Sequence, residues 1–276
     1  MFLDPAVVVL PAFAQEDNAG EASEVAPWFD VYDFGSTEVD GLAQPLYYTD
    51  DVVLAPTGIG KAPTATTVAT LAAGDTVSLA DATMVTVGIA GAPPSVGTLG
   101  SVFVADTVVD WDPKMRLDDA FELPRWNAEY VWDLDPDLVE RAAAAARTVD
   151  LADSERARTI RAQYDDDRDP SVGVGPTIGS DELYHGRKIT AEVQRLCELY
   201  GLDGYATTEM ESAATAVALE RFGLLDRYVS VRGVSNFDRE PPGGDPTESI
   251  DGLAFDLGVE NAVTAGRAVV ESLLDD

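Results

Sequence analysis

The sequence is poor in cationic residues. Its 276 residues include 18 Lys and Arg against 50 Asp and Glu, which gives a net charge of -32, and only three of the cations are lysines. A nucleic-acid partner requires a basic surface, so this charge balance excludes nucleic-acid binding. An acidic surface also repels anionic lipids. Dense carboxylates with scarce lysine indicate a halophilic source, as among haloarchaea, because the Debye length falls to about 3 Å in molar salt.

Cysteine and long apolar runs are scarce as well. Cys197 is the only cysteine, so an intrachain disulfide is impossible and a reducing, cytoplasmic location is expected. No apolar run approaches the roughly 20 residues of a membrane-spanning helix. The stretch "AFAQ" at 12–15 is similar to a signal-peptidase site, but no Lys or Arg precedes it, and Asp4 and Pro11 interrupt the short apolar run. We expect a buried first strand there.

Short apolar runs alternate with alanine-rich helical patterns. With 46% hydrophobic residues the chain can bury a sizeable core. Strands are expected at Val7–Leu10, Val52–Ala55, Met84–Ile89, Val102–Val109 and Tyr228–Val234. Helices are expected at 62–73, 140–147, 210–222 and 258–274. This alternation predicts an α/β fold with a largely parallel sheet covered on both faces. We find no Ser/Gly-rich linker and expect one domain over 1–276.

Two segments are predicted to lack long regular elements. Residues 111–136 are rich in Trp, Asp and Pro and are expected to form an irregular excursion. Residues 164–176 look like another loop, although "VGVGPTI" at 172–178 is compatible with a strand.

Two glycine-containing segments follow predicted strands. "TGIGK", residues 57–61, opens a helix, where backbone N–H groups suit an anion or a polar ligand. It matches neither the P-loop nor GxGxxG spacing, and a tight structural turn is the alternative. "GIAG", residues 88–91, ends another strand, where α/β sheets bind ligands. A plain strand exit is the alternative here.

Three polar motifs occur later in the chain. "SDELYHGRK", residues 180–188, holds His185, the sole histidine, which can be either structural or functional. "SNFD" at 235–238 ends a strand, and Asn236 there can donate to and accept from a heterocycle or simply form a turn. In "TTEMESAAT", residues 207–215, two glutamates flank Met210 before small residues. That stretch is either a solvated turn or a site that grips a sugar.

Taken in order, these motifs resemble the nucleoside phosphorylase superfamily of purine nucleoside phosphorylases and methylthioadenosine nucleosidases. The sequence is most similar to its purine nucleoside permease branch. The segments that carry this resemblance are "APTGIGKA", "GIAGAPPSVGTLGSV", "HGRK", "TEMESAA" and "SNFDREPPGG". The resemblance runs from Val7 to about residue 265. It implies a single nucleoside-phosphorylase-like α/β domain with a mixed, partly barrel-like central sheet flanked by helices.

The resemblance also implies roles around a ribose. Met210 would supply an adaptable apolar surface, and Glu211 would accept hydrogen bonds from the ribose hydroxyls. Glu209 would support them or lie next to the base. Glu16 aligns with the acidic residue after the first strand, which activates water in nucleosidases. We expect it to be the catalytic base.

On the base side the sequence departs from the family pattern. Asn236 stands where the usual "SD" aspartate protonates the purine. Because asparagine can donate a hydrogen bond but is no acid, 6-oxopurines become plausible substrates and Asp238 a substitute acid. Further residues expected to contact the base are Phe13, Gly91, Leu183 and Tyr184.

The nucleophile is left open between water and phosphate. The "VGIAG" loop lacks the arginine with which hexameric phosphorylases bind phosphate, which favours water. The candidates for an anion or polar-loop site are Gly58, Gly60, Lys61, Gly88, Ala90, His185, Arg187 and Arg232. We expect neither a metal nor an organic cofactor.

Two functions follow from the resemblance. The first is cleavage of the N-glycosidic bond of inosine, guanosine or adenosine, by hydrolysis or with phosphate as a second substrate. The second is a non-catalytic nucleoside-binding component of a transport system. A permease must cross a membrane and this chain has no such segment, so the family name can describe uptake driven by intracellular cleavage. Family habit implies a homo-oligomer with sites near subunit contacts.

Overall fold

The computed structural model describes residues 2–14, 23–118, 120–123, 130–250 and 253–275. The strands are β1 (Val7–Leu10), β2 (Gly35–Thr37), β3 (Leu46–Tyr48), β4 (Val52–Leu54), β5 (Thr83–Ala92), β6 (Val102–Val104), β7 (Thr107–Asp110), β8 (Met115–Leu117), β9 (Ala120–Glu122), β10 (Val131–Asp133), β11 (Val172–Val174), β12 (Thr177–Gly179), β13 (Thr207–Glu209) and β14 (Tyr228–Phe237). The helices are η2 (Ala26–Asp30), α1 (Lys61–Ala73), α2 (Pro136–Ala146), α3 (Glu155–Arg161), η3 (Ala162–Tyr164), α4 (Arg187–Leu199), α5 (Ser212–Phe222), η4 (Leu225–Arg227), α6 (Pro246–Ser249) and α7 (Phe255–Leu274).

A mixed sheet of twelve strands forms the centre of the molecule, in the order β10-β7-β12-β13-β5-β1-β4-β3-β2, with β14, β6 and β11 branching from β5. β5 is parallel to β1 and β14 but antiparallel to β13. The carboxyl ends of β1, β5 and β14 therefore meet at one edge of the sheet, which is where α/β sheets bind ligands. The predicted α/β class with a mixed central sheet and flanking helices is confirmed.

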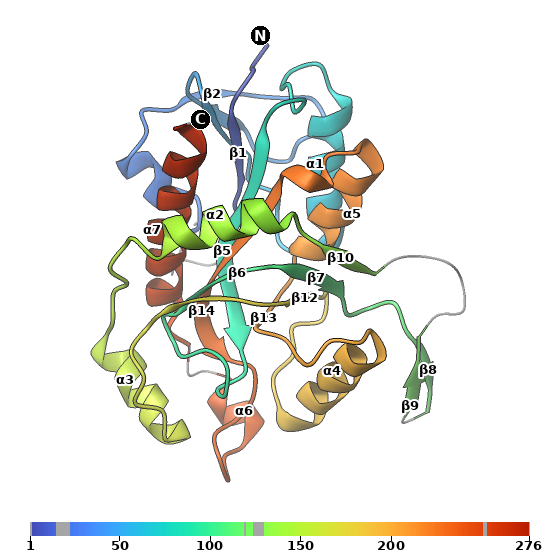
Figure 1. Cartoon of the computed structure of the whole chain (residues 1–276), viewed down its shortest axis with the longest axis vertical. Helices are drawn as coiled ribbons and strands as arrows, with labels where there is room; N and C mark the ends of the chain where they lie inside the picture. Colours follow the sequence, from blue (N-terminus) through green and yellow to red (C-terminus); the bar gives the residue numbers. More distant parts are fainter. Residues whose placement is uncertain (1, 15–22, 119, 124–129, 251–252, 276) are drawn as a thin grey trace.

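The apolar runs form strands because both faces of the sheet are covered. All four residues of β1 are buried between β4 and β5, as expected for an apolar run without alternation. α7 packs on β14, β5 and β1, and α2 packs against α7. α1 and α5 pack against each other on the other side of the sheet (Figure 1). The predicted first strand, the strand-turn-helix reading of "TGIGK" and the four helical segments are confirmed, with ends shifted by a few residues.

One predicted strand is wrong as a single element. The run Val102–Val109 is divided into β6 and β7, which pair with different neighbours. The break is at Ala105, whose N–H binds the Ser230 carbonyl, and Asp106, whose carbonyl accepts from Leu134. Apolar residues on both sides of the break are buried, so the hydrophobic pattern carries no sign of the change of partner.

The segments read as loops hold short strands. Residues 111–136 contain the β8–β9 hairpin, which projects from the body in Figure 1, and β10. β11 and β12 lie within "VGVGPTI" and its neighbours, so the strand anticipated there is confirmed. Strands of three residues are too short to give a periodic signal.

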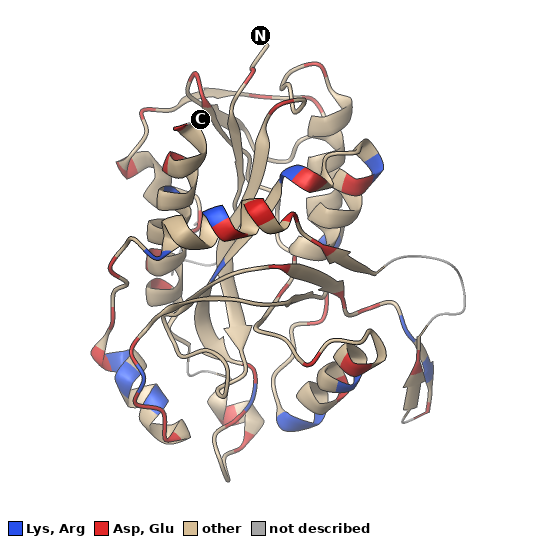
Figure 2. Ribbon diagram, in the orientation of Figure 1, with Lys and Arg blue, Asp and Glu red and all other residues tan. Residues whose placement is uncertain are grey.

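Acidic residues are spread over the helices and loops of the molecule, and the fewer Lys and Arg are scattered among them, with small groups on α3 and at the start of α4 (Figure 2). In the part of the chain that the structure describes, no helix combines the length and the apolar character needed to cross a membrane. Within the same ranges, no three His, Cys, Asp or Glu side chains converge in a way that suits a metal ion.

Candidate functional site

A cavity of about 260 Å³ lies at the edge where β1, β5 and β14 end. Its lining residues come from the segment after β1, the turn before α1, the β5 end, the segment after β12, the β13–α5 junction, the β14 end, and the segment that leads into α7 with the first residue of that helix. They are Ala12, Phe13, Glu24, Ile59, Ile89, Ala90, Gly91, Leu183, Thr208, Glu209, Met210, Glu211, Ser235, Asn236, Ile250, Leu253 and Phe255. All five of the sequence motifs described above therefore contribute to one pocket.

Buried charges are concentrated on one side of this pocket. The Arg232 guanidinium lies 2.6 Å from Glu209 Oε2 and 3.1 Å from Glu211 Oε2, and the Arg232 side chain is only 1% exposed. Glu209 Oε2 also accepts the N–H groups of Glu211 and Ser212, both at 2.8 Å. These bonds end β13 and set the start of α5. Glu209 and Glu211 are thus buried at the β13–α5 junction, where both pair with Arg232. They do not form a solvated turn.

The "TGIGK" turn contributes to the same charges through its backbone. Gly60 N–H donates to Glu211 Oε1 at 3.0 Å, and Gly60 has a φ of 89°, a conformation that glycine adopts without strain. Gly58 has a φ of 81° as well. Gly60 of this motif therefore helps to orient the Glu211 carboxylate.

Glu24 is the third carboxylate of the group and is 2% exposed. Its Oε2 accepts the Ala12 N–H at 2.7 Å and its Oε1 the Ile89 N–H at 2.8 Å. Gly88 makes this approach possible, since a Cβ there would lie 2.5 Å from Glu24 Oε1 and 3.0 Å from an Arg232 nitrogen. The two N–H bonds leave Glu24 fixed between the β1 and β5 ends.

Burial perturbs the titration of these acids. Burial and then the Glu211 charge raise the pKa of Glu24 to about 7, against the opposing effects of Arg232 and the two backbone N–H groups. Burial also raises the pKa of Glu211, while Arg232 opposes the shift. We refer to Glu24, Glu209, Glu211 and Arg232 as the buried charge cluster. Three carboxylates against one guanidinium give this cluster a negative balance when all are ionised.

The opposite side of the pocket is shaped around Asn236. A register shift in the β14–β5 pairing between Val234 and Asn236 turns this side chain toward the pocket, where it faces Gly91. A Cβ at Gly91 would lie 2.9 Å from Asn236 Nδ2. Asn236 Nδ2 donates to the Phe237 carbonyl at 3.1 Å, and its Oδ1 accepts from Ser235 Oγ at 3.0 Å. This arrangement leaves one amide hydrogen available to a ligand.

The other residues expected on the base side have different places. Phe13 lines the pocket, and so does Leu183, whose side chain is 76% exposed. Tyr184 is buried against Trp111, with ring centroids 5.9 Å apart, and is not among the lining residues. Of these two adjacent residues, the structure therefore places the non-aromatic Leu183 at the pocket and not the aromatic Tyr184.

Asp238 is fully buried away from the pocket lining. Its carboxylate accepts from Tyr205 Oη at 2.6 Å and pairs with Arg239 Nε at 2.6 Å. His185 is half-buried behind Asn236, where it bonds to Phe237 and Ser249. The "SNFD" and "SDELYHGRK" motifs thus meet beside the pocket. Asn236 faces the pocket, whereas Asp238 and His185 are not among its lining residues.

Two candidate anion-binding cations are engaged elsewhere. Lys61 Nζ lies 2.7 Å from Asp110 and 2.5 Å from Asp112, and we refer to these three residues as the rim charge cluster. Arg187 is half-exposed and lies 3.5 Å from Glu240. Arg232 is near the pocket but already holds two carboxylates. Gly88 and Ala90 lie within strand β5 and not in the loop that the sequence suggested, and Ala90 lines the pocket.

Glu16, the expected base, lies outside the described residues. Glu24, eight positions further along the same acidic stretch, was missed from the sequence. The only signal for Glu24 in the local sequence is that it lies directly before Val25 and close to Trp28, two apolar residues that are buried. Sequence spacing after β1 favoured the earlier glutamate, whereas the contact of Glu24 with Ile89 depends on the folded chain.

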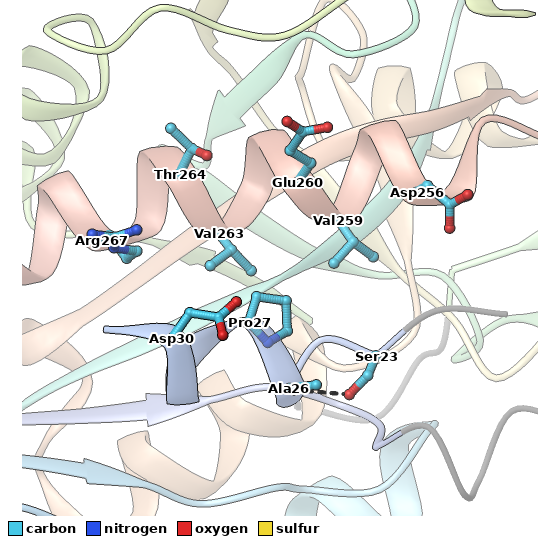
Figure 3. Close-up of a pocket in the computed structure, with 10 residues that line it drawn as sticks. All are labelled: Ser23, Ala26, Pro27, Asp30, Asp256, Val259, Glu260, Val263, Thr264 and Arg267. Carbon is cyan, nitrogen blue, oxygen red and sulfur yellow. Dashed lines mark hydrogen bonds between the residues drawn. The ribbon is translucent and has the colours of Figure 1, made fainter. Parts of the chain in front are cut away.

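A second cavity of about 400 Å³ lies between η2 and α7 (Figure 3). Exposed acids line it, including Asp30, Asp256 and Glu260, and Ser23 Oγ accepts the Ala26 N–H at 2.9 Å as a local cap. Predicted ribose- and base-side residues, among them Met210, Glu211 and Asn236, line the smaller cavity instead. The smaller cavity is therefore the candidate site.

Comparison with known families agrees with the motif order. The model of the purine nucleoside permease family matches residues 4–132 and 120–276. The chain belongs to this family. A relative named "Probable purine nucleoside permease C285.05", from Schizosaccharomyces pombe, is 26% identical over 221 residues, which cover 66% of this chain and 63% of the relative. The chain thus spans somewhat less than two thirds of that permease family member.

Solved structures share the fold at low sequence identity. A futalosine hydrolase mutant of Helicobacter pylori has a TM-score of 0.67 at 17% identity, covering 98% of this chain and 99% of its own. A 5'-methylthioadenosine/S-adenosylhomocysteine nucleosidase from Neisseria meningitidis, in complex with methylthio-immucillin-A, has 0.66 at 19%, covering 97% of both chains. The nucleosidase from Colwellia psychrerythraea, in complex with adenine, has 0.65 at 20%, covering 99% and 96%. This permease family member therefore has the nucleosidase fold.

Proposed function

We propose that this protein hydrolyses the N-glycosidic bond of purine nucleosides. The observation that supports this most is the buried charge cluster at the pocket wall, in which Glu209 and Glu211 pair with one guanidinium and Glu24 feels the charges of Glu211 and Arg232. Glycoside cleavage passes through an oxocarbenium-like transition state with positive charge on the sugar. A negative, water-poor site stabilises that charge more than it stabilises the neutral nucleoside.

Each group has a role in the proposed reaction. Glu211 accepts hydrogen bonds from the ribose hydroxyls and Met210 contacts the sugar. As the bond between C1' and the purine nitrogen breaks, its electron pair goes to the base. Glu24 takes a proton from water, whose oxygen bonds to C1'. The base takes a proton from solvent, Glu24 later releases its own, and the products are ribose and the free purine.

The electrostatic balance favours water over phosphate as the nucleophile. A phosphate dianion entering this pocket would meet three carboxylates, and Arg232 is already bound to two of them. Lys61 and Arg187 are held by other acids. A phosphorylase would need at least one of these cations to leave its partner.

Asn236 favours purines with a 6-oxo group. Its Nδ2 has one hydrogen left after the bond to Phe237, and that hydrogen can be donated to N7 or O6 of the base. A neutral amide cannot protonate adenine. We therefore expect inosine and guanosine to be cleaved faster than adenosine.

The family name gives the alternative, a nucleoside-binding component of transport that does not cleave its ligand. A single assay separates the two functions. Purified protein in molar KCl is incubated with inosine, guanosine or adenosine, with and without phosphate, and free base, ribose and ribose 1-phosphate are quantified. We expect base and ribose without phosphate. Nucleoside binding without any product would support the transport component.

The catalytic base is tested with two matched variants. Glu24→Gln should slow base release by about 10²–10⁴-fold, the usual contribution of a general base, while nucleoside binding persists. Glu16→Gln is the control, because Glu16 is the residue that the sequence favoured. If Glu16→Gln causes the large loss and Glu24→Gln does not, the base is Glu16. Ribose 1-phosphate that increases with phosphate concentration would instead make the protein a phosphorylase.

A further inference from the structure

His185, the only histidine of the chain, lies behind the pocket and contacts two of its elements. Its Nδ1 is 3.1 Å from the Phe237 carbonyl at the end of β14. Its Nε2 is 2.8 Å from Ser249 Oγ at the end of α6. Phe237 follows Asn236, and Ser249 precedes Ile250, so each partner of the imidazole is next in sequence to a pocket residue.

The two contacts define the tautomer of His185. A carbonyl oxygen only accepts, so Nδ1 carries the hydrogen and donates it to Phe237. In the neutral imidazole Nε2 then accepts from the Ser249 hydroxyl. Burial lowers the pKa of His185, although the Phe237 carbonyl, Asp238 and Glu240 oppose that shift. The neutral form with hydrogen on Nδ1 is therefore favoured near pH 7.

The Phe237 carbonyl is shared between His185 and the base-facing side chain. It accepts Asn236 Nδ2 at 3.1 Å as well as His185 Nδ1. A carbonyl has two lone pairs, so both bonds form together. The imidazole fixes the peptide plane after the irregular β14 residue, and that plane fixes which face of the Asn236 amide reaches the pocket.

The second contact acts on the chain between β14 and α7. At the start of this segment, directly after Phe237, the Asp238 carbonyl accepts the Gly186 N–H at 2.9 Å. Its other end is held through Ser249, next to Ile250 of the pocket lining. His185 thus bridges the residue that follows Asn236 and the residue that precedes Ile250.

We propose that His185 is a positioning residue that sets base preference through Nδ1 and nucleoside affinity through Nε2. The proposal rests on the proposed function, since it assumes that Asn236 reads the purine. The Nδ1 bond keeps the Asn236 amide hydrogen toward the 6-oxo group. The Nε2 bond keeps Ile250 against the ligand.

Three conservative variants separate the two bonds. In His185→Asn the amide nitrogen can occupy the Nδ1 position and donate to Phe237 but cannot reach Ser249. In His185→Gln the amide reaches the Nε2 position and loses the bond to Phe237. Ser249→Ala removes only the partner of Nε2. Loss of one such bond should change the affected constant by about two- to tenfold.

The readouts are kcat and KM for inosine and adenosine, together with calorimetric binding of hypoxanthine and adenine. We expect His185→Gln to lose the preference for the 6-oxo ligand, and His185→Asn and Ser249→Ala to keep it while KM rises for both nucleosides. In the double variant His185→Asn/Ser249→Ala, KM should rise no further than in either single variant.

Base binding keeps this test independent of catalysis. If the wild type releases no base but hypoxanthine and adenine binding follow the expected pattern, the proposed function fails and the role of His185 is supported. A merely structural role predicts equal losses for both bases and similar effects of Asn and Gln at 185. That result, with wild-type melting temperatures in the variants, overturns the proposal.

Discussion

Two groups of charges near the pocket use the same ingredients in different surroundings. In the buried charge cluster the side chains of Arg232, Glu209 and Glu211 are 1%, 1% and 6% exposed. In the rim charge cluster those of Lys61, Asp110 and Asp112 are 18%, 14% and 31% exposed. Water can screen the second group but barely reaches the first.

The difference appears in the acids' affinity for protons. In the buried charge cluster, desolvation and a neighbouring charge raise the pKa of Glu24 to about 7. In the rim charge cluster, burial raises the pKa of Asp110, whereas for Asp112 burial is outweighed by the Asp181 N–H and Lys61 and the pKa is lowered. Both clusters thus contain an acid whose pKa burial raises, but in the more deeply buried cluster the pKa of Glu24 reaches about 7, a range that suits acid-base chemistry.

The two clusters should differ most in what the loss of their cation costs in stability. Arg232→Met leaves buried carboxylates without a partner and should destabilise the fold by about 3–5 kcal/mol. Lys61→Met leaves carboxylates that water can reach and should cost about 1 kcal/mol or less. The free energy of unfolding of each variant, from urea titration in molar KCl, measures this difference.

Salt gives the control for that experiment. Between molar and lower KCl the cost of Lys61→Met should change, since screening acts on exposed pairs, while that of Arg232→Met should hold. Equal costs for the two variants would show that burial does not distinguish the clusters. The same titration on the wild type tests the predicted halophilic source, because a net charge of -32 should lower stability as salt is removed.

A smaller effect is expected when the sugar contact is weakened. Glu211→Gln keeps the acceptor for Gly60 N–H but removes the charge that is proposed to bind the ribose hydroxyls, a contact that would be worth about 1.5–3 kcal/mol, or roughly 10–150-fold in Kd. Calorimetry with inosine measures the loss. Asp112→Asn is the matched change at the rim and should leave Kd almost unchanged.

A ligand without the hydroxyls completes this test. 2',3'-Dideoxyinosine should bind the wild type and the Glu211→Gln variant with similar affinity, because the contact in question is absent. Near-normal binding of inosine to Glu211→Gln would remove Glu211 from the ribose site.

The smallest expected change is a graded one with pH. Since Glu24 must be ionised to accept a proton from water, kcat/KM should rise about tenfold per pH unit below its pKa and level off above about 7. Because its pKa is raised above the ordinary 4.5, the folded chain binds that proton more tightly than the unfolded chain does. Its ionisation should therefore reduce stability as pH rises from about 4.5 to about 7.

The Glu24→Gln variant provides the reference for both curves. Its residual rate should lack the rise toward pH 7, and its stability should change less over the same range. A pH profile that is the same in the wild type and in Glu24→Gln would mean that another group titrates.

The amino-acid sequence by itself determined the longer helices, the main apolar strands and the order of the motifs. Apolar runs such as Val7–Leu10 and glycine turns such as Gly58 and Gly60 act through backbone conformation and burial, which depend on near neighbours in the chain. Met210, Glu211 and Asn236 were likewise found from local patterns, and the structure brings all three to one pocket. Their roles remain proposals.

Only the tertiary structure decided which charges meet. Glu24 bonds to Ile89, Gly60 to Glu211 and His185 to Ser249, across separations of 65, 151 and 64 residues. The division of Val102–Val109 into β6 and β7 depends on distant strands in the same way. Hydrophobic periodicity records that a residue is buried but not what it is buried against. For a buried carboxylate, those neighbours set the proton affinity and therefore the chemistry.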